Sequence, residues 1–343
     1  MPPTPTASNA MVTGVVCFYL VAALSMVMAN KWVLNITSAP MFFLLTQLAI
    51  AVVLFVSANA MRILPDRLTF DLKICKALFP MVALSLLSLT LSNFTLKYVD
   101  ASFYQVARGL VLPFTVAISG FVLHTSPSLR ILVACALVTS GFFVGVFLDG
   151  TALPLTGVGF GVASSTVTAL HSVVIKQSLN AVNGSAILLS WYTHIMSVVA
   201  LSPIVLFFEG PAVSQLLFPP LAGTPDASAA LRTFIWGSLI TGGVGFSMSL
   251  ASLLSIKVTS PITHMVSSAV RGVAASLLGV WLFKDVVTSG RASSIFIILA
   301  GSVYYTWVKH QEGEAARQNE KEAAADVRLA DMEGGKGKEG AGA

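Results

Sequence analysis

Apolar stretches of about twenty residues recur along almost the whole chain, and this pattern limits the available folds more than any other feature. A helix needs about 20 mainly apolar residues to cross a bilayer, and such segments recur between Val12 and Lys309. Only 10% of the residues are charged, whereas a soluble domain has about 25%. The sequence therefore predicts an all-α polytopic membrane protein. It excludes a soluble enzyme, a secreted disulfide-rich module and a nucleic-acid-binding protein.

Ten transmembrane helices are predicted, with charged or polar residues between them. Residues 1–11 are rich in Pro, Ser and Thr and are predicted to be disordered. Residues 310–343 form a charged tail that we expect outside the membrane, with a partly helical beginning. The ten predicted helices are 12–34, 40–59, 77–96, 101–123, 131–148, 157–177, 187–208, 232–256, 260–283 and 293–309.

An even number of crossings places both termini on the same side of the membrane. Lys and Arg are more numerous on that side than on the other, with a concentration between Met61 and Lys76. The positive-inside rule counts these residues in short loops. Both termini are therefore predicted to lie in the cytosol.

The ten spans divide into two groups of five, residues 12–148 and 157–309. An odd number of spans in each group requires opposite orientations, as in transporters built from inverted repeats. LSNFTLKYVDASFYQVARGLV from Leu91 aligns without a gap with ASLLSIKVTSPITHMVSSAVR from Ala251, and Lys97 then matches Lys257. The sequence predicts a five-plus-five inverted repeat.

Two arginines, Arg108 and Arg271, lie inside predicted spans, whereas every acidic residue before the tail lies in a loop or at a span end. A buried cation costs at least about 2.5 kcal/mol at a helix centre and therefore faces a cavity or a partner. Since the spans contain no carboxylate, we expect the missing anion to be the substrate. A guanidinium suits phosphate because it makes paired hydrogen bonds. The alternative for Arg108 is snorkelling or bonding to backbone carbonyls.

Polar and aromatic side chains accompany the two arginines. Three polar residues share a helix face with Arg271, and Tyr104 shares one with Arg108. Adjacent aromatic and polar residues in the seventh span suit stacking on a base, with an interfacial belt or helix packing as the alternative. The predicted substrate-binding residues are Arg271, Arg108, Tyr192, Trp191, Thr193, His194, His264, Ser267, Ser268, Tyr104 and Lys257.

The sequence contains no P-loop, no cluster of metal ligands and no catalytic triad. It therefore predicts no enzyme activity, no cofactor and no metal site. The cysteines Cys17, Cys75 and Cys135 have no motif spacing and are assigned to packing. Glycines in the fifth, sixth and eighth spans are expected to let helices approach closely.

Three segments, NFTLKYVDASFYQVARGLV, SIKVTSPITHMVSSAVRG and SVYYTWVK, resemble a known family. They are similar to the nucleotide-sugar transporters of the drug/metabolite and triose-phosphate translocator superfamily, with the GDP-fucose transporter branch nearest, over residues 15–309. The resemblance implies ten helices, cytosolic termini and a Golgi or endoplasmic reticulum membrane. It also implies exchange of a cytosolic nucleotide sugar for a nucleoside monophosphate from the lumen.

Two departures from that family bear on the substrate. Relatives that carry GDP-sugars typically have F-Y-N-N in the seventh span, where this chain has Trp191-Tyr192-Thr193-His194, and a Lys where it has Arg271. The missing amides favour UDP-xylose exchanged for UMP, with GDP-fucose exchanged for GMP as the alternative. A phosphate or sugar-phosphate translocator and a non-transporting scaffold are further alternatives. The oligomeric state stays open, a homodimer included.

Overall fold

The computed structural model of the chain describes residues 9–123, 126–148, 154–218, 225–258, 261–284 and 287–339. Within these ranges the chain is helical and has no strand, as the sequence predicts. The elements are α1 (Asn9–Leu34), α2 (Pro40–Ala60), α3 (Leu72–Tyr98), α4 (Ala101–Gly109), α5 (Val111–Leu123), α6 (Leu129–Phe147), α7 (Leu155–Ser178), the 3-10 helix η1 (Leu179–Val182), α8 (Ala186–Phe208), α9 (Gly210–Leu217), α10 (Pro225–Val258), α11 (Pro261–Phe283) and α12 (Ser289–Glu339).

Seven candidate membrane spans are found among the described residues, judged by helix length and apolar composition. They are α1, α2, α3, α4 together with α5, α6, α7 and α8. Helices α10, α11 and α12 coincide with the last three predicted spans. Their crossing of the membrane, and with it the ten-span inverted repeat, stays a prediction.

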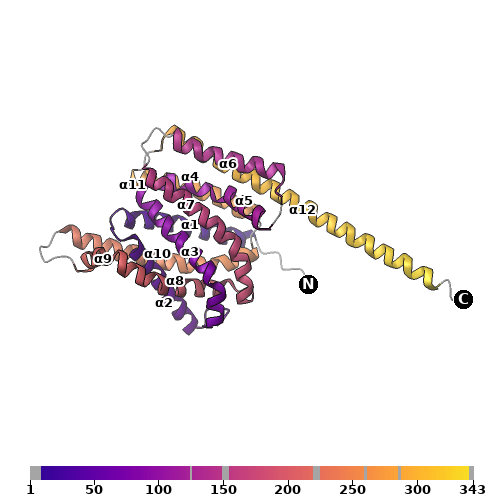
Figure 1. Cartoon of the computed structure of the whole chain (residues 1–343), viewed down its shortest axis with the longest axis horizontal. Coiled ribbons are helices and arrows are strands. Elements are labelled where there is room, and N and C mark those ends of the chain that lie inside the picture. The colour runs from indigo at the N-terminus through magenta and orange to yellow at the C-terminus, as the bar shows by residue number, and fades with distance from the viewer. Residues whose placement is uncertain are drawn as a thin grey trace.

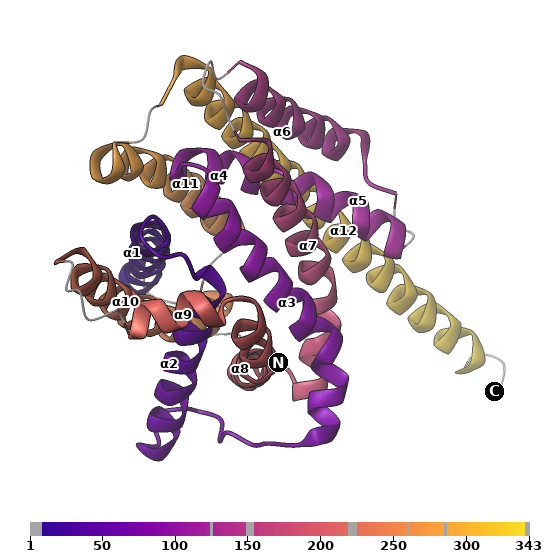
Figure 2. The same cartoon turned by 60° about the vertical axis from the view of Figure 1, so that its left-hand side comes forward.

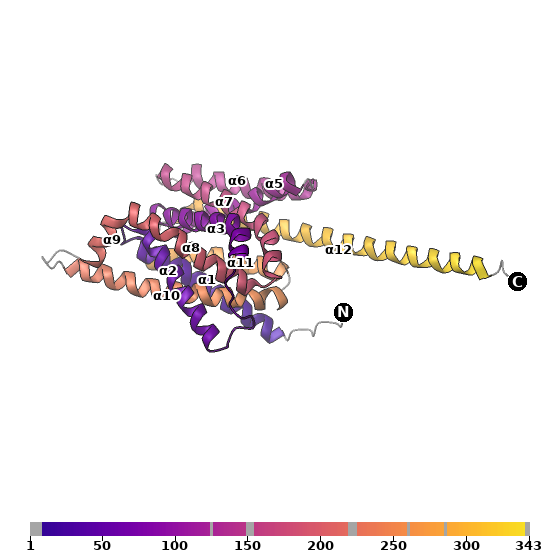
Figure 3. The same ribbon diagram turned by 60° about the horizontal axis from the view of Figure 1, so that its bottom comes forward.

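Both ends of the chain leave the bundle on the same side. The start of α1 and the projecting part of α12 both lie on the right-hand side of the bundle in two views (Figures 1 and 3). We call this end of the bundle the terminus side, and the opposite end, where α3 ends and α4 begins, the far side. Two boundaries differ from the prediction, because α1 already begins at Asn9 and α12 continues well past Lys309.

The helices pack in long pairs, α6 along α12, α3 along α7 and α1 along α10 (Figure 2). Gly141 shows how closely α6 and α12 approach. A Cβ atom at this position would lie 2.8 Å from Ile298 Cγ1 and 3.1 Å from the backbone nitrogen of Ile298. The expected role of glycine in close helix packing is confirmed at this contact.

The predicted fourth span is interrupted at Leu110, between α4 and α5. Pro113 has no N–H and so cannot complete the hydrogen-bond ladder of a continuous helix. That ladder would have paired Pro113 with Gly109, four residues earlier. One turn before the proline, the carbonyl of Ala107 accepts hydrogen bonds from Leu110 N at 3.2 Å and from Ser165 Oγ of α7 at 2.7 Å. A neighbouring hydroxyl thus satisfies the irregular backbone. The break places Arg108 in the last turn of α4.

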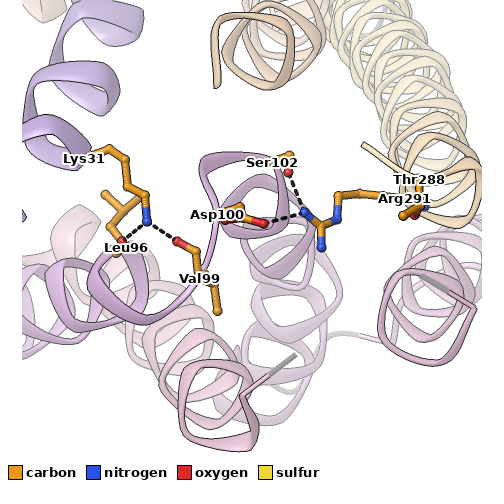
Figure 4. A network of polar contacts seen from close by, with 7 residues as sticks. All are labelled: Lys31, Leu96, Val99, Asp100, Ser102, Thr288 and Arg291. Atoms are coloured by element: carbon orange, nitrogen blue, oxygen red, sulfur yellow. Dashed lines mark hydrogen bonds and ion pairs between the residues drawn. The ribbon is translucent and has the colours of Figure 1, made fainter. Parts of the chain in front are cut away.

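An ion pair joins α12 to the start of α4 on the far side (Figure 4). Arg291 is fully buried, and its Nη1 atom donates to Asp100 Oδ2 at 3.0 Å and to Ser102 Oγ at 2.9 Å. Asp100 directly precedes α4 and remains partly exposed. The contact therefore links the two predicted halves of the chain.

Lys31 closes the end of α3 on the same side (Figure 4). Its buried Nζ atom donates to Leu96 O at 2.8 Å and to Val99 O at 2.6 Å. The last carbonyls of a helix have no partner within the helix. Lys31 thus supplies donors at the end of α3 and fixes the end of α1 against it.

Glu209, directly after α8, caps the start of α2 in a similar way. Its carboxylate accepts hydrogen bonds from Met41 N at 3.1 Å and from Phe42 N at 2.8 Å. Burial raises the pKa of Glu209, while the two amide donors and the nearby Lys97 oppose this rise. This contact is a second link between the predicted halves on the far side.

Replacing Arg291 tests the far-side ion pair. We expect Arg291→Met to lower the free energy of unfolding by about 1–2 kcal/mol, because it removes the donor to buried Ser102 and the partner of the partly exposed Asp100. Thermal unfolding in detergent, followed by tryptophan fluorescence, measures the change. The control is Arg130→Met at the exposed start of α6, and equal midpoints for the two variants would contradict the role assigned to Arg291.

Candidate functional site

A polar cavity of about 310 Å³ lies in the middle of the helix bundle. Its walls come from α1, α3, α4, α7 and α10, so both predicted halves contribute. Its size is at the lower end of the range for small-molecule sites, about 300–1,000 Å³. The polar lining residues are Tyr19, Asn30, Ser85, Ser88, Ser92, Asn93, Tyr104, Gln105, Arg108, Thr168 and His171.

Arg108 carries the positive charge of this cavity. The residue lies between helices and yet keeps an exposed surface, because it faces the cavity. Its Nη1 atom donates to the hydroxyl of Tyr104 at 3.0 Å, one turn earlier on α4. No Asp or Glu is among the described residues that line the cavity. The cavity thus offers guanidinium donors to an anion, and phosphate matches their geometry.

Hydroxyl groups hold the cavity wall between α3 and α7. Ser88 Oγ lies 2.6 Å from Thr168 Oγ1, and Ser92 Oγ lies 2.8 Å from Ser164 Oγ. Such interhelical hydrogen bonds satisfy polar groups that apolar surroundings cannot. They fix the spacing of the two helices that carry much of the cavity's polar lining.

Asn93 provides an unused donor in the same wall. The residue is only 5% exposed, and its Nδ2 atom has no hydrogen-bond partner. A buried donor without a partner costs about 1–3 kcal/mol. A ligand in the cavity that carries an acceptor would offset this cost, so Asn93 is a candidate ligand contact.

The α3 residues of the cavity were not among the predicted site residues, although their spacing in the sequence carries a signal. Ser85, Ser88 and Ser92 recur at three- and four-residue intervals in an otherwise apolar span, and this spacing puts them on one face of a helix. A stripe of small polar groups inside a span indicates a polar interior. Charged residues alone do not reveal this stripe.

Trp191 and Tyr192 lie in a different place, near the terminus side, in a buried apolar cluster. Trp191 Nε1 donates to Thr69 O at 3.0 Å, and Tyr192 OH accepts from Asp71 N at 2.9 Å. Neither residue lines the central cavity. In this structure they tie α8 to the loop before α3, and their contact with a base stays a prediction.

Thr193 and His194 also lack a position in the cavity lining. Thr193 Oγ1 donates to Leu189 O at 2.7 Å, and the His194 Nδ1 atom lies 2.7 Å from Ser190 O. Both contacts are local to α8. Of the predicted residues whose side chains are described, the structure thus brings Tyr104 and Arg108 together and leaves the α8 group apart.

Five predicted site residues have side chains outside the described part of the structure. Their backbones belong to α10 and α11, and their proposed roles stay predictions. They are Lys257, His264, Ser267, Ser268 and Arg271.

The chain has recognisable relatives along almost its whole length. Residues 10–306 match the Triose-phosphate Transporter family. "GDP-fucose transporter 1" of Mus musculus is 30% identical, over 90% of this chain and 88% of its own length. "GDP-fucose transporter, Golgi" of Drosophila melanogaster is 28% identical, over 91% of this chain and 93% of its own length. A solved crystal structure with 13% identity covers 89% of this chain and 99% of its own, with a TM-score of 0.51, so the fold is shared.

Arg108→Gln tests the anion site directly. We expect the affinity for inorganic pyrophosphate, measured by calorimetry in detergent, to fall about ten- to a hundredfold, because charge-assisted hydrogen bonds are lost. Arg108→Lys should lose less, since the charge remains. Arg130→Gln, which removes an exposed cation at the start of α6, should bind as the wild type does. Unchanged binding by Arg108→Gln would remove this residue from the site.

Tyr192→Phe separates the packing role of α8 from ligand contact. Loss of the hydroxyl that accepts from Asp71 N should lower the free energy of unfolding by about 1 kcal/mol. Because Tyr192 lies outside the cavity lining, the affinity for a nucleoside diphosphate should not change. A large loss of affinity at unchanged stability would instead support the base contact that the sequence alone predicts.

Proposed function

Because the chain belongs to the Triose-phosphate Transporter family, we propose that it exchanges GDP-fucose for GMP across the Golgi membrane. The family and the named relatives are transporters rather than enzymes, and relatives of this family include nucleotide-sugar transporters. The observation that carries the proposal is a central cavity with an arginine and no described carboxylate in its lining. The diphosphate of a nucleotide sugar supplies the negative charge that the described lining of the cavity does not.

The nucleotide in this proposal differs from the first choice made on the sequence. UDP-xylose ranked first there because the seventh span lacks the two amides of GDP-sugar carriers. The relatives instead carry names of GDP-fucose transporters. Asn30 and Asn93 also place amide groups in the cavity itself, so the missing amides of α8 no longer count against guanine. UDP-xylose therefore has no support beyond that absence.

The proposed site assigns one role to each described group. Arg108 binds the diphosphate, with its guanidinium held by the Tyr104 hydroxyl at 3.0 Å. Asn93 donates its free Nδ2 hydrogens to an acceptor on the base or sugar. Arg271 remains a second proposed phosphate ligand, from the sequence.

Exchange rather than one-way transport follows from the charge of the cavity. An empty cavity would hold a buried cation without an anion, and such a state is costly in hydrocarbon surroundings. A returning monophosphate neutralises the same cation. The cavity therefore changes sides more readily with an anion bound than when it is empty. This difference is the physical basis of obligatory antiport in the proposal.

Alternating access in this proposal requires contacts at the two sides to separate in turn. On the far side, Arg291 and Asp100 join the two predicted halves. On the terminus side, Tyr192 and Trp191 of α8 contact the loop before α3. The cavity lies between these two sets of contacts. Both chain ends are proposed to lie in the cytosol, and the oligomeric state stays open.

Uptake into proteoliposomes tests the function. We expect vesicles preloaded with GMP to take up labelled GDP-fucose faster than vesicles preloaded with UMP or phosphate. Stimulation by UMP alone, with UDP-xylose as the transported nucleotide sugar, would instead support exchange of UDP-xylose for UMP. Stimulation by phosphate alone would indicate a phosphate or sugar-phosphate translocator.

Folded protein without any exchange would support a non-transporting scaffold. Circular dichroism and the thermal unfolding midpoint establish that the reconstituted protein is folded. Arg108→Gln serves as the matched variant in the same assay. It should abolish most of the GMP-stimulated uptake while its helical content stays at the wild-type level.

A further inference from the structure

A second cavity, separate from the central one, forms an apolar groove between α3 and α8. Its volume is about 650 Å³, and it shares no lining residue with the central cavity. We call it the α3–α8 groove. Its lining residues on α3 run from Leu72 to Thr90, and those on α8 from Ile195 to Ile204. Apart from Thr90, the lining is apolar or, at Cys75, a thiol.

The groove lies open on the outside of the bundle. Leu72 is 74% exposed, Phe79 63% and Val199 69%. At a rise of about 1.5 Å per residue, the α3 part of the groove is about 27 Å long. The hydrocarbon core of a bilayer is about 30 Å thick. The predicted span begins at Ala77, so about 20 Å of the groove, up to Thr90, would lie within the bilayer core. Lipid chains are the available occupants there.

Basic residues stand at the terminus-side end of the groove. Lys76 lies one turn from Leu72 and one turn from Phe79, on the face of α3 that lines the groove. Both Lys73 and Lys76 are exposed, and the preceding loop adds Arg62 and Arg67.

The two acidic residues of that loop already have hydrogen-bond partners. Asp71 accepts from Lys73 N at 2.8 Å as the cap of α3. Asp66 accepts from Ser185 Oγ. The net charge at the terminus-side end of the groove is therefore positive. The ammonium groups of Lys73 and Lys76 are exposed there and can bind an external anion.

We propose that the α3–α8 groove binds an anionic phospholipid. Its acyl chains lie along α3 against Phe79 and Ala83, and its phosphate lies near Lys76 and Lys73. Basic clusters beside membrane-spanning helices attract anionic headgroups, with about 1 kcal/mol per Lys or Arg. The two halves of this arrangement, an apolar channel and a cationic end, match the two halves of one lipid molecule.

A second copy of the chain fits this surface less well. A two-fold contact uses the same patch on both partners, and partners in one membrane share the same orientation. Lys73 and Lys76 of one copy would then lie at the same depth as those of the other. The like charges would repel, whereas a phosphate attracts them.

Native mass spectrometry of the full chain in detergent tests the proposal with two probes, phosphatidylserine and phosphatidylcholine. We expect the wild type to bind phosphatidylserine more tightly. Lys76→Gln should weaken phosphatidylserine binding about fivefold, the equivalent of about 1 kcal/mol. It should weaken phosphatidylcholine binding less, because choline offsets the charge of the phosphate in that lipid. Arg130→Gln, at the exposed start of α6, should change neither. Equal affinity of the wild type for both lipids, or an equal effect of both variants, would overturn the headgroup assignment.

Filling the groove tests the position of the acyl chains. Ala83 lines the groove and is exposed, and Ala136 is an exposed alanine on α6 outside it. Ala83→Trp should displace bound lipid, whereas Ala136→Trp should not. Retained binding in Ala83→Trp overturns the proposal. Loss of a dimer in the same spectra, without loss of lipid, also overturns it, because a second copy would then occupy the groove.

Alkylation of Cys75 measures occupancy of the groove without substituting any residue that lines it. In a Cys17→Ser, Cys135→Ser background, Cys75 is the single thiol of the chain. Since Cys75 lines the groove, phosphatidylserine should slow its alkylation by a membrane-permeant maleimide more than phosphatidylcholine does. Identical rates with and without phosphatidylserine would contradict the proposal even if Ala83→Trp failed to fold.

Discussion

Two buried cations on the far side hold helix ends that would otherwise have no partner. Lys31 donates to the carbonyls of Leu96, in the last turn of α3, and of Val99, directly after it. Arg291 binds the carboxylate directly before α4. Because Lys31 and Arg291 are both buried, water does not replace these contacts. The turn between α3 and α4 is therefore fixed from two sides. Because this turn sets where α4 begins, it also sets where Tyr104 and Arg108 meet the cavity.

The helices were predictable because the information that specifies them is local. A run of about twenty apolar residues is sufficient to indicate a membrane helix, and the pairing of Tyr104 with Arg108 follows from their four-residue spacing. The ion pair of Arg291 with Asp100 spans 191 positions of sequence. No local pattern distinguishes those two residues from other charges at span ends, so only the tertiary structure reveals the contact.

The aromatic pair on α8 shows why a chemical pattern alone does not locate a site. A ring with a polar tip can stack on a base or hydrogen-bond to a backbone. In the structure, the Trp191 and Tyr192 polar atoms are used by the loop that holds Thr69 and Asp71. Asn93 is the reverse case. Its sequence neighbours give no sign of a site, and its candidate role rests on an Nδ2 donor without a partner in the structure. Burial and partner geometry decide between such roles, and neither can be seen in a linear sequence.

The interruption at Leu110 has an electrostatic consequence for the cavity. Because α4 ends there, Arg108 lies in its last turn, where the carbonyl end of the helix favours a cation. The start of α5 at Val111 opposes part of this effect. Backbone dipoles thus supply part of the counter-charge that no described carboxylate in the cavity lining provides. The guanidinium is charged at every physiological pH, and the dipole does not titrate. Attraction of an anion to this point consequently requires no proton to be taken up or released.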